Sequence, residues 1–565
     1  MSSVIKVLSP DVINLIAAGE VIDSFAAVVR ELVENSLDAG ANRITISLFP
    51  EIWRVQVADN GQGISLTNLQ TCGLAHSTSK IHTCDDLVKI VSLGFRGEAL
   101  HSLAQLAQLE IFSCLASESG LHVAYDRDGQ PGNPEPIAMA PGTIVKVSEL
   151  FGNFPVRRRG LPNFKVQLKA VQNLIHKTAL CYPKVTWQVY KNNQSWFHLS
   201  PGATAKEILP QIIKQVQPSD LQFLSQEVAT PGKERESGEK STLELVIGLP
   251  DRCHRRRADW VKVAVNGRMV RLPEIEQTIL ARFSKTLPRD RYPVGFVHLH
   301  VPPEQIDWNR HPAKAEIYLH NLDYWCEQVS QAITEALRIS PANLGATVYN
   351  QRVGKLLKVS EKKDSYQVNR ELATTQKQSK NSEIALIELR AVAQVRNTYI
   401  VAEHPNGLWL VEQHIAHERV LYEQLLDNWE IVPLENPLVL NDLISIQLEQ
   451  LELLGLSIEP FGEQMWMVRS APKMLHQRDD CTAAIIELSQ EGDLQAAQVA
   501  TACRSAIRNG TSLSLGEMQR ILDDWQCTRN PHTCPHGRPI YLSLEESALA
   551  RFFRRHWVIG KSHGI

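Results

Sequence analysis

The stretch Glu31-Leu-Val-Glu-Asn-Ser-Leu-Asp-Ala-Gly40 decides the fold of the first part of the chain. Its periodicity predicts a helix over residues 25–37 that ends at the Asp-Ala-Gly sequence, because glycine is common just past a helix C-terminus. At 100° per residue, Asn35 and Asp38 fall within about 40° of Glu31 around the helix axis, and leucine and valine occupy the opposite side. One face of the helix therefore carries two carboxylates and an amide.

These three side chains suit the hydrolysis of a phosphoanhydride. The carboxylate of Glu31 can orient and deprotonate a water molecule, and the amide oxygen of Asn35 can hold a Mg²⁺ ion that bridges phosphates. The same pattern also fits an ordinary amphipathic helix with a solvated polar face. The sequences around the helix decide between the two interpretations.

A glycine-containing segment with one leading carboxylate follows the helix. Asp59 precedes Gly61 and Gly63, where the backbone can approach a flat ligand closely. The Asp59 carboxylate can accept a hydrogen bond from an exocyclic amine. A plain β-turn is the alternative interpretation.

Two more polar segments supply groups that bind phosphate. Thr78, Ser79 and Lys80 offer two hydroxyls and an ammonium, and the sequence GFRGEAL at residues 94–100 leads into a predicted helix. The free N–H groups at such a helix start form a cradle for anions. The glycine pair alone is explained equally well by helix caps.

The remaining pattern of the first 155 residues favours an α+β fold. Runs typical of β-strands lie at residues 43–49, 53–58, 111–113 and 142–147, and a second helix is predicted over residues 100–109. A helix precedes an antiparallel sheet without regular βαβ alternation, which favours an α/β sandwich over a doubly wound fold.

The composition sets limits for the whole chain. At 565 residues it has room for three or four domains. It carries 59 Lys and Arg against 62 Asp and Glu, so any nucleic-acid binding must use local basic patches. The ten cysteines show no disulfide framework, the first residues do not resemble a signal peptide, and no apolar run approaches the roughly 20 residues of a membrane span. We expect a soluble, cytoplasmic protein.

The chain past residue 203 divides into three further parts. A second α/β unit is predicted over residues 204–340, and a third unit, of α+β type, over residues 384–565. Residues 341–383 are polar and poor in large apolar side chains, which predicts a flexible linker. In the second unit the strands are predicted at residues 243–249, 261–265 and 295–301, and the helices at residues 273–282 and 325–337.

Taken in order, five motifs of the first unit resemble the MutL family of DNA mismatch-repair proteins, which belongs to the ATPase superfamily of gyrase, histidine kinases and related chaperones. The resemblance continues with VNGR at residues 265–268 and HPAK at residues 311–314, and so covers about the first 340 residues. The five motifs are IAAGEV (16–21), ELVENSLDAG (31–40), DNGQG (59–63), HSTSK (76–80) and GFRGEAL (94–100).

The resemblance implies an ATP-binding domain over residues 1–203, a ribosomal S5-like transducer domain over residues 204–340, and binding of ATP with Mg²⁺. Glu31 would be the general base and Asn35 the Mg²⁺ ligand. Asp59 would bind the adenine amino group. The other implied nucleotide contacts are Asp38 and Gly63 near the base, Thr143 on a strand beneath the adenine, and a lid formed by Thr78, Ser79, Lys80, Gly94, Phe95, Arg96, Gly97, Glu98, Ala99 and Leu100.

The transducer domain would contribute one further residue to this site. By the resemblance, Lys314 reaches the γ-phosphate and reports ATP against ADP to the rest of the molecule. An ammonium on a flexible stem suits that role. A surface lysine in a His-Pro loop is the alternative.

The C-terminal unit contains residue types that bind transition metals. His414 and Glu418 lie four residues apart where a strand runs into a predicted helix, so both side chains share one helical face. Cysteine, histidine and carboxylate ligands suit Zn²⁺, with Mn²⁺ at a neighbouring position richer in oxygen. Each cysteine taken alone is also explained by core packing. The candidate metal ligands are Glu412, His414, Glu418, Cys503, Cys534 and His536.

These segments resemble the endonuclease form of MutL, which nicks DNA at such a metal site. The first motif departs from the family's Asp-Gln-His-Ala, because this chain has Glu412 and Ile415. Glutamate can still bind a metal, and the CPHGRP motif at residues 534–539 is present. We therefore expect metal-dependent nicking. The alternative is an ATP-switched scaffold that does not cut. The ATPase module of a type II topoisomerase ranks far below both, because the chain lacks room for a tyrosine-bearing cleavage domain and shows no trace of one.

Basic clusters mark the candidate DNA contacts. Arg268 and Arg271 are the predicted contacts, and phosphate contacts of this kind give weak, salt-sensitive binding without sequence preference. Solvated surface patches are the alternative. The other clusters lie at residues 157–159 and 254–257 and at Arg551, Arg554 and Arg555.

The resemblance also implies partners. It predicts a homodimer that works with the mismatch-recognition protein MutS and on DNA, associated with the nucleoid during repair. The leucine-rich stretch at residues 443–454 is a candidate dimer surface or a helix packed in its own domain. A docking motif for the sliding clamp would contain glutamine and end in proline; residues 432–437 match it poorly, so a clamp contact stays open.

Overall fold

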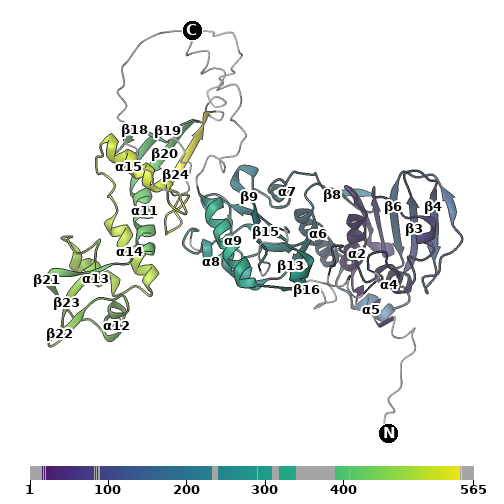
Figure 1. The fold of residues 1–565 in the computed structure, drawn as a ribbon, viewed down its shortest axis with the longest axis horizontal. Coiled ribbons are helices and arrows are strands. Elements are labelled where there is room, and N and C mark those ends of the chain that lie inside the picture. The colour runs from purple at the N-terminus through teal and green to yellow at the C-terminus, as the bar shows by residue number, and fades with distance from the viewer. Residues whose placement is uncertain are drawn as a thin grey trace, which may run out of the picture. The chain divides into compact units, whose positions relative to one another are not determined.

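The computed structural model describes residues 15–338, 389–546 and 549, apart from residues 17, 20, 82, 84, 85, 87, 88, 232–239, 289, 308–316 and 406 (Figure 1). The predicted linker and Lys314 lie outside the described residues. The chain forms two compact units. The first comprises Met1–Gly248, Asp259–Leu280 and Val294–Ser330, and the second comprises Leu249–Ala258, Ala281–Pro293 and Gln331–Ile565.

An eight-stranded mixed sheet forms the first half of the first unit, in the order β5-β4-β3-β6-β2-β1-β7-β8. Strand β1 pairs antiparallel with β2 and parallel with β7. The strands are β1 (Arg43–Phe49), β2 (Arg54–Asp59), β3 (Gln108–Cys114), β4 (Gly120–Tyr125), β5 (Glu135–Ile137), β6 (Gly142–Ser148), β7 (Thr186–Lys191) and β8 (Gln194–Leu199).

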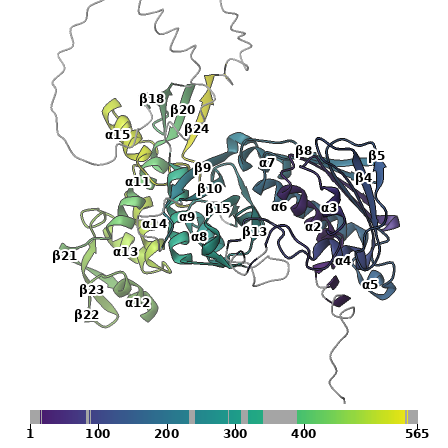
Figure 2. The ribbon, with the colours of Figure 1, turned by 45° about the vertical axis from the view of Figure 1, so that its right-hand side comes forward.

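Helices cover one side of this sheet, and Figures 1 and 2 both show α2 and α6 there. Alternate residues of β1 are buried, as expected for a strand with one face in the core. The apolar side of α2 packs onto β1 and β2. The helices are α2 (Phe25–Asp38), α3 (Leu66–Leu69), α4 (Ala99–Leu106), α5 (Pro155–Gly160), α6 (Phe164–Cys181) and α7 (Ala205–Ile212), with 3₁₀ turns at η1 (Pro50–Ile52) and η3 (Pro218–Asp220).

The second half of the first unit is built on a five-stranded sheet in the order β13-β12-β15-β10-β9. Strands β12 and β15 are parallel, and the other neighbours are antiparallel. Its strands are β9 (Leu221–Val228), β10 (Ser241–Gly248), β12 (Val261–Val265), β13 (Arg268–Val270) and β15 (Gly295–His300). Nearby elements are α8 (Pro273–Phe283), η4 (Pro303–Gln305), β16 (Ile306–Asp307), β17 (Tyr318–Leu319) and α9 (Leu322–Leu337).

The second unit has a four-stranded sheet, β18-β19-β20-β24, and a three-stranded sheet, β21-β23-β22, with α11 and α14 between them in Figure 1. A separate apolar core fills each part. Among the described helices of the chain, none has the length and apolarity needed to cross a membrane. The elements are β11 (His254–Arg255), β14 (Tyr292–Pro293), β18 (Arg390–Val395), β19 (Tyr399–His404), β20 (Gly407–Glu412), α11 (Gln413–Asp427), β21 (Ile431–Asn441), α12 (Ser445–Leu453), β22 (Ile458–Gly462), β23 (Met465–Pro472), α13 (Cys481–Leu488), α14 (Leu494–Ser505), α15 (Leu515–Gln526) and β24 (Tyr541–Glu545).

The α+β fold class is confirmed, and the differences from the predicted elements have local causes. The helix predicted over residues 100–109 ends at Leu106, because the next residues alternate into the sheet core as β3. Trp53 was predicted in a strand, but it closes a 3₁₀ turn with φ 51°. The leucine-rich stretch forms α12, which buries Leu451 in the core of its own domain and leaves Ile446 and Leu453 exposed.

One buried histidine gives the first unit a pH-dependent stability. His298 on β15 is 2% exposed, and its Nε2 accepts a hydrogen bond from the N–H of Gly267 at 2.9 Å. Burial, aided by the nearby charge of His300, lowers the pKa of His298 to about 3. The neighbouring Glu244 carboxylate acts in the opposite direction but has the smaller effect. The folded protein therefore holds a neutral imidazole where the unfolded chain holds an imidazolium once the pH falls below 6.5.

The neutral His298 should make the protein less stable in acid. Its contribution is fully present above pH 6.5 and is lost as the pH falls from 6.5 toward 3, at roughly 1.4 kcal/mol per pKa unit. Melting temperatures of the full chain measured across this range should fall more steeply for the wild type than for His298→Gln, which can still accept the Gly267 hydrogen bond. Parallel curves would contradict this.

Candidate functional site

A cavity of about 650 Å³ lies where α2 faces the lid segments. Every residue predicted at the nucleotide site lines it, other than Lys314, which lies outside the described residues. Segments from five places in the sequence therefore meet in one cavity: the α2 face, the turn after β2, the two lid segments at residues 76–80 and 94–100, and Thr143 on β6. Sequence reasoning did not assign Ser36, Cys72 or Ile111, which line it too.

Helix α2 is fixed at both ends, so its polar face has a defined direction. The Ser24 hydroxyl caps the first turn by accepting from the N–H of Ala27 at 3.2 Å, and Gly40 leaves the helix with φ 74°. The side opposite the cavity is buried, as for Val29 and Val33. This packing leaves Glu31, Asn35 and Asp38 at the cavity, as the helical spacing predicted.

The Glu31 carboxylate is oriented by its neighbour in the sequence. Arg30 donates to Glu31 Oε1 from Nε at 3.1 Å and from Nη2 at 3.0 Å. The second carboxylate oxygen has no hydrogen bond among those described. A carboxylate held by one oxygen can present the other to a water molecule.

Asp59 lines the same cavity in a hydrogen-bonded position. Ser36 Oγ donates to Asp59 Oδ2 at 2.7 Å, and the N–H of Gly61 donates to Oδ1 at 2.8 Å. Burial raises the pKa of Asp59, and these hydrogen bonds oppose the rise. Gly63 has φ 80°, and a Cβ there would lie 2.4 Å from the carbonyl oxygen of Cys114, so only glycine fits this wall.

Asp38 binds the lid. Its Oδ1 accepts from the N–H of Leu93 at 2.8 Å, its Oδ2 accepts from the N–H of Gly94 at 2.9 Å, and Lys80 forms an ion pair with it. Lys80 Nζ also lies 3.5 Å from Asn35 Oδ1. Backbone N–H groups and an ammonium are the usual partners of phosphate oxygens. In this conformation these lid groups bind the Asp38 carboxylate.

A second cluster lies in the C-terminal unit, where the structure brings together Glu418 of α11, Cys534 and His536. Their ligand atoms lie within 4.8 Å of one another, and Glu418 is fully buried. His536 Nδ1 is 2.8 Å from Glu418 Oε1, and the two side chains form an ion pair. A buried carboxylate beside an imidazole and a thiol fits a set of metal ligands.

The charges within this cluster are coupled. Burial alone would raise the pKa of the Cys534 thiol, but hydrogen bonds from His536 and Arg538 bring it below its usual value. Hydrogen bonds to Cys534 and Glu418 raise the pKa of His536 to about 9. Sequence reasoning missed Arg538, which donates to Glu418 Oε2 at 2.9 Å and to Cys534 Sγ at 3.5 Å. Its place in the CPHGRP motif was the available signal.

The other predicted metal ligands lie outside the tight group. Burial raises the pKa of Cys503, and the charges of Glu418 and Cys534 add to the rise, so Cys503 is within electrostatic range of the cluster. His414 Nδ1 hydrogen-bonds the Ile507 carbonyl at 3.0 Å. Glu412 caps α11 by accepting from the N–H of Ile415, and Asn509 donates to its other oxygen.

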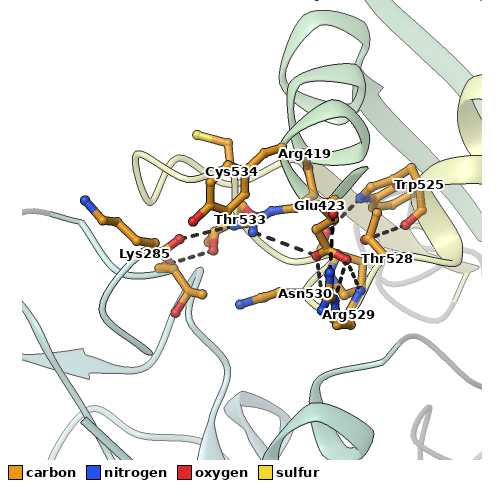
Figure 3. A network of polar contacts seen from close by, with 12 residues as sticks. Lys285, Arg419, Glu423, Trp525, Thr528, Arg529, Asn530, Thr533 and Cys534 are labelled. Carbon is orange, nitrogen blue, oxygen red and sulfur yellow. Dashed lines mark hydrogen bonds and ion pairs between the residues drawn. The ribbon is translucent and has the colours of Figure 1, made fainter. Parts of the chain in front are cut away.

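A buried network holds the loop that carries Cys534 (Figure 3). The Glu423 carboxylate accepts from the N–H groups of Arg529 at 2.7 Å and Asn530 at 3.1 Å. Arg419 Nε donates to the Thr533 carbonyl at 2.8 Å. Both anchors come from α11, the helix that carries Glu418, so one helix sets the positions of both halves of the cluster.

The two predicted DNA contacts differ in exposure. Arg271 is exposed, whereas Arg268 is 8% exposed and donates to both carboxylate oxygens of Glu34, at 3.2 and 3.1 Å. A phosphate contact by Arg268 would require this pair to open. Arg256 and Arg257 are exposed, and the predicted cluster at residues 551–555 lies outside the described residues.

The chain matches known protein families and known proteins. The family models that match are "Histidine kinase-, DNA gyrase B-, and HSP90-like ATPase" at residues 23–128, "DNA mismatch repair protein, C-terminal domain" at residues 223–338 and "MutL C terminal dimerisation domain" at residues 392–513. The chain is similar to the DNA mismatch repair protein MutL of Rippkaea orientalis, with 62% identity over 100% of both chains, and to that of Nostoc sp., with 60% identity over 100% of both. A crystal structure of the N-terminal domain of a DNA repair protein is 26% identical and covers 57% of this chain and 97% of its own, with a TM-score of 0.49.

The contacts of Asp38 predict how the lid responds to a substitution. Asp38→Ala removes the acceptor of Leu93, Gly94 and Lys80, so the segment around Lys89 and Arg96 should be cut by trypsin several times faster than in the wild type, as local opening becomes easier. Mass spectrometry of the early fragments measures this. Asp128→Ala, at an exposed carboxylate in another loop, is the matched control. Equal rates in all three proteins would show that Asp38 does not hold the lid.

Proposed function

The chain belongs to the MutL family of DNA mismatch-repair proteins, and from this premise we propose that it is an ATP-gated homodimer that couples mismatch recognition to strand processing and nicks DNA itself. Its place in mismatch repair and its ATPase domain follow from the family. The observation that carries the nucleotide part is the single cavity in which all the described residues of the predicted nucleotide site meet.

The described residues support a specific division of labour in ATP hydrolysis. Glu31, held by Arg30 through one oxygen, would take a proton from the attacking water. Asn35 would hold the Mg²⁺ ion, which supplies positive charge to the phosphate oxygens when bound. Asp59 would accept a hydrogen bond from the adenine amino group. Hydrogen bonds from Ser36 and Gly61 hold its carboxylate in a fixed orientation for that contact.

The contacts of Asp38 support a mechanism for closing the lid on ATP. Bound triphosphate would compete with the Asp38 carboxylate for Lys80 and for the N–H groups of Leu93 and Gly94. The other lid residues, Thr78, Ser79 and the segment from Gly94 to Leu100, line the same cavity. We propose that Lys314 of the transducer domain then contacts the γ-phosphate, as the resemblance implies.

The C-terminal cluster supports a metal site and hence nicking. We propose Glu418, Cys534 and His536 as ligands of Zn²⁺ or Mn²⁺, with Cys503 next to them. A bound metal would polarise a phosphate oxygen and supply hydroxide for phosphodiester cleavage. The Glu412 and His414 positions would complete the site only if Glu412 left its place as the cap of α11.

The cap role of Glu412 favours the second candidate function. The Glu412 carboxylate accepts hydrogen bonds from Ile415 and Asn509. In this conformation Glu412, the predicted metal ligand of the first motif, therefore lies outside the group of Glu418, Cys534 and His536. A MutL protein in that state would be an ATP-switched scaffold that brings partners together without cutting DNA. Metal content and nicking separate the two functions.

Partners and location follow from the same proposal. The matched dimerisation domain supports a homodimer. We propose that the dimer works with MutS in the cytoplasm, at the nucleoid during repair, and binds DNA without sequence preference through exposed groups such as Arg271. The near-neutral net charge of −3 makes recruitment by partners and ATP state more important than bulk attraction to DNA. Contact with a sliding clamp stays open.

Glu31→Gln tests the assignment of the general base. It should lower kcat for ATP hydrolysis by at least about a hundredfold, because the amide cannot accept the proton of the attacking water. The affinity for a non-hydrolysable ATP analogue should stay close to that of the wild type. Phosphate release and equilibrium binding measure the two quantities, and Glu118→Gln, at an exposed site, is the control. Hydrolysis at the wild-type rate would refute the assignment.

Glu418→Ala tests the metal site. Elemental analysis of the purified protein should show loss of a bound transition metal, and Mn²⁺-dependent nicking of supercoiled plasmid should be abolished. Cys527→Ser, which removes an exposed thiol, should change neither quantity. A metal-loaded wild type that does not nick, but gains nicking with Glu412→Asp, would select the scaffold function.

A further inference from the structure

A buried ion pair joins the helix of the nucleotide cavity to the five-stranded sheet. Glu34 on α2 and Arg268 at the start of β13 are separated by 234 residues in the sequence, and both lie in the first compact unit. The two guanidinium nitrogens donate to the two carboxylate oxygens at 3.2 and 3.1 Å, with side chains only 8% and 13% exposed. Such parallel bonds fix orientation as well as distance.

The turn that carries Arg268 is itself held rigidly. Asn266 and Gly267 take positive φ values of 45° and 80°, and the Asn266 amide group both donates to the Val301 carbonyl at 2.8 Å and accepts from the Val301 N–H at 2.9 Å. A Cβ at Gly267 would lie 2.1 Å from the hydroxyl of Tyr182, so the turn sits directly against the residue that ends α6. Arg268 therefore reaches α2 from a fixed base.

A group that resembles a metal site belongs to the same support. Glu244 and His298 are paired across β10 and β15, and His300 lies on the same face, with separations of 3.8 and 3.9 Å from the carboxylate. However, His298 Nε2 accepts the N–H of Gly267 at 2.9 Å. In the neutral ring the proton is then on Nδ1, facing Glu244, and no lone pair is left there for a metal. His298 serves the turn, not an ion.

The position of Glu34 on α2 makes the pair relevant to the nucleotide. Glu34 lies about 60° from Glu31 around the helix axis and one residue before Asn35. A displacement of Glu34 would rotate α2 about its axis and move Glu31 and Asn35 relative to the phosphates. A misplacement of about 1 Å can slow a reaction by roughly a hundredfold. Substituting one side chain would also remove the paired hydrogen bonds from the buried charge that remains, which favours a shift of the helix.

We propose that Arg268 is a positioning residue of the ATP site, and that its paired hydrogen bonds to Glu34 set the rotation of α2 and thereby the placement of Glu31 and Asn35. This proposal rests on the proposed ATPase function. It assigns Arg268 a role that does not require DNA. It also gives the five-stranded sheet a rigid connection to the catalytic helix.

Steady-state ATP hydrolysis by the full chain without DNA tests this proposal. Arg268→Lys keeps the positive charge but cannot make two parallel hydrogen bonds, so kcat should fall about tenfold or more while KM stays within about twofold. Glu34→Gln should give the same split. Arg282→Lys, at an exposed position, should match the wild type.

A double substitution supplies a second readout. If the two side chains act as one unit, Glu34→Gln combined with Arg268→Gln should lower kcat no further than the worse single variant, because the second substitution removes no further contact between them. Binding of a non-hydrolysable ATP analogue confirms that each variant is folded.

Two results would overturn the proposal. The first is an Arg268→Lys variant whose kcat equals that of the wild type. The second is weaker binding of the ATP analogue together with a lower melting temperature in Arg268→Lys, Glu34→Gln and the double variant, which would show that the pair has a purely structural role. The proposed function is judged separately. It fails only if the wild type does not hydrolyse ATP or if Glu31→Gln hydrolyses it normally.

Discussion

The nucleotide site depends on one constraint, which is the fixed rotation of α2 about its own axis. Its apolar side is buried against β1 and β2, and its N-terminus is capped by Ser24. The ion pair between Glu34 and Arg268 holds its flank. Because side chains on one helix keep a fixed angular spacing, this rotation places Glu31, Asn35 and Asp38 together at the cavity. The lid contacts then follow from where Asp38 is placed.

Both candidate sites satisfy their buried charges with groups of the protein itself. Asp38 pairs with Lys80 and lid N–H groups, and Glu418 pairs with Arg538 next to His536. A buried charge without a partner is costly, so each site has an internal partner in this conformation. Binding of triphosphate or metal would exchange one set of partners for another, and each site can therefore rearrange without exposing a bare charge.

Much of the site was predictable from the sequence because its spacing is local. The face of α2 follows from helical geometry, and the strand at residues 43–49 was placed with its observed bounds. The Glu418, Cys534 and His536 group was predicted from residue type and the family resemblance. The pair between Glu34 and Arg268 was not predictable, because its partners lie 234 residues apart and neither residue type requires the other. Glu412 caps α11 through the nearby Ile415, but its hydrogen bond from Asn509 spans 97 residues, and no local pattern indicates that bond.

The rotation of α2 can be measured directly by amide hydrogen exchange. The comparison is between the wild type and Arg268→Lys, both bound to a non-hydrolysable ATP analogue without DNA. If the Glu34 pair holds the helix, the amides of α2 should exchange faster in the variant, while those of the five-stranded sheet keep their protection. Identical protection of α2 in the two proteins would contradict the account.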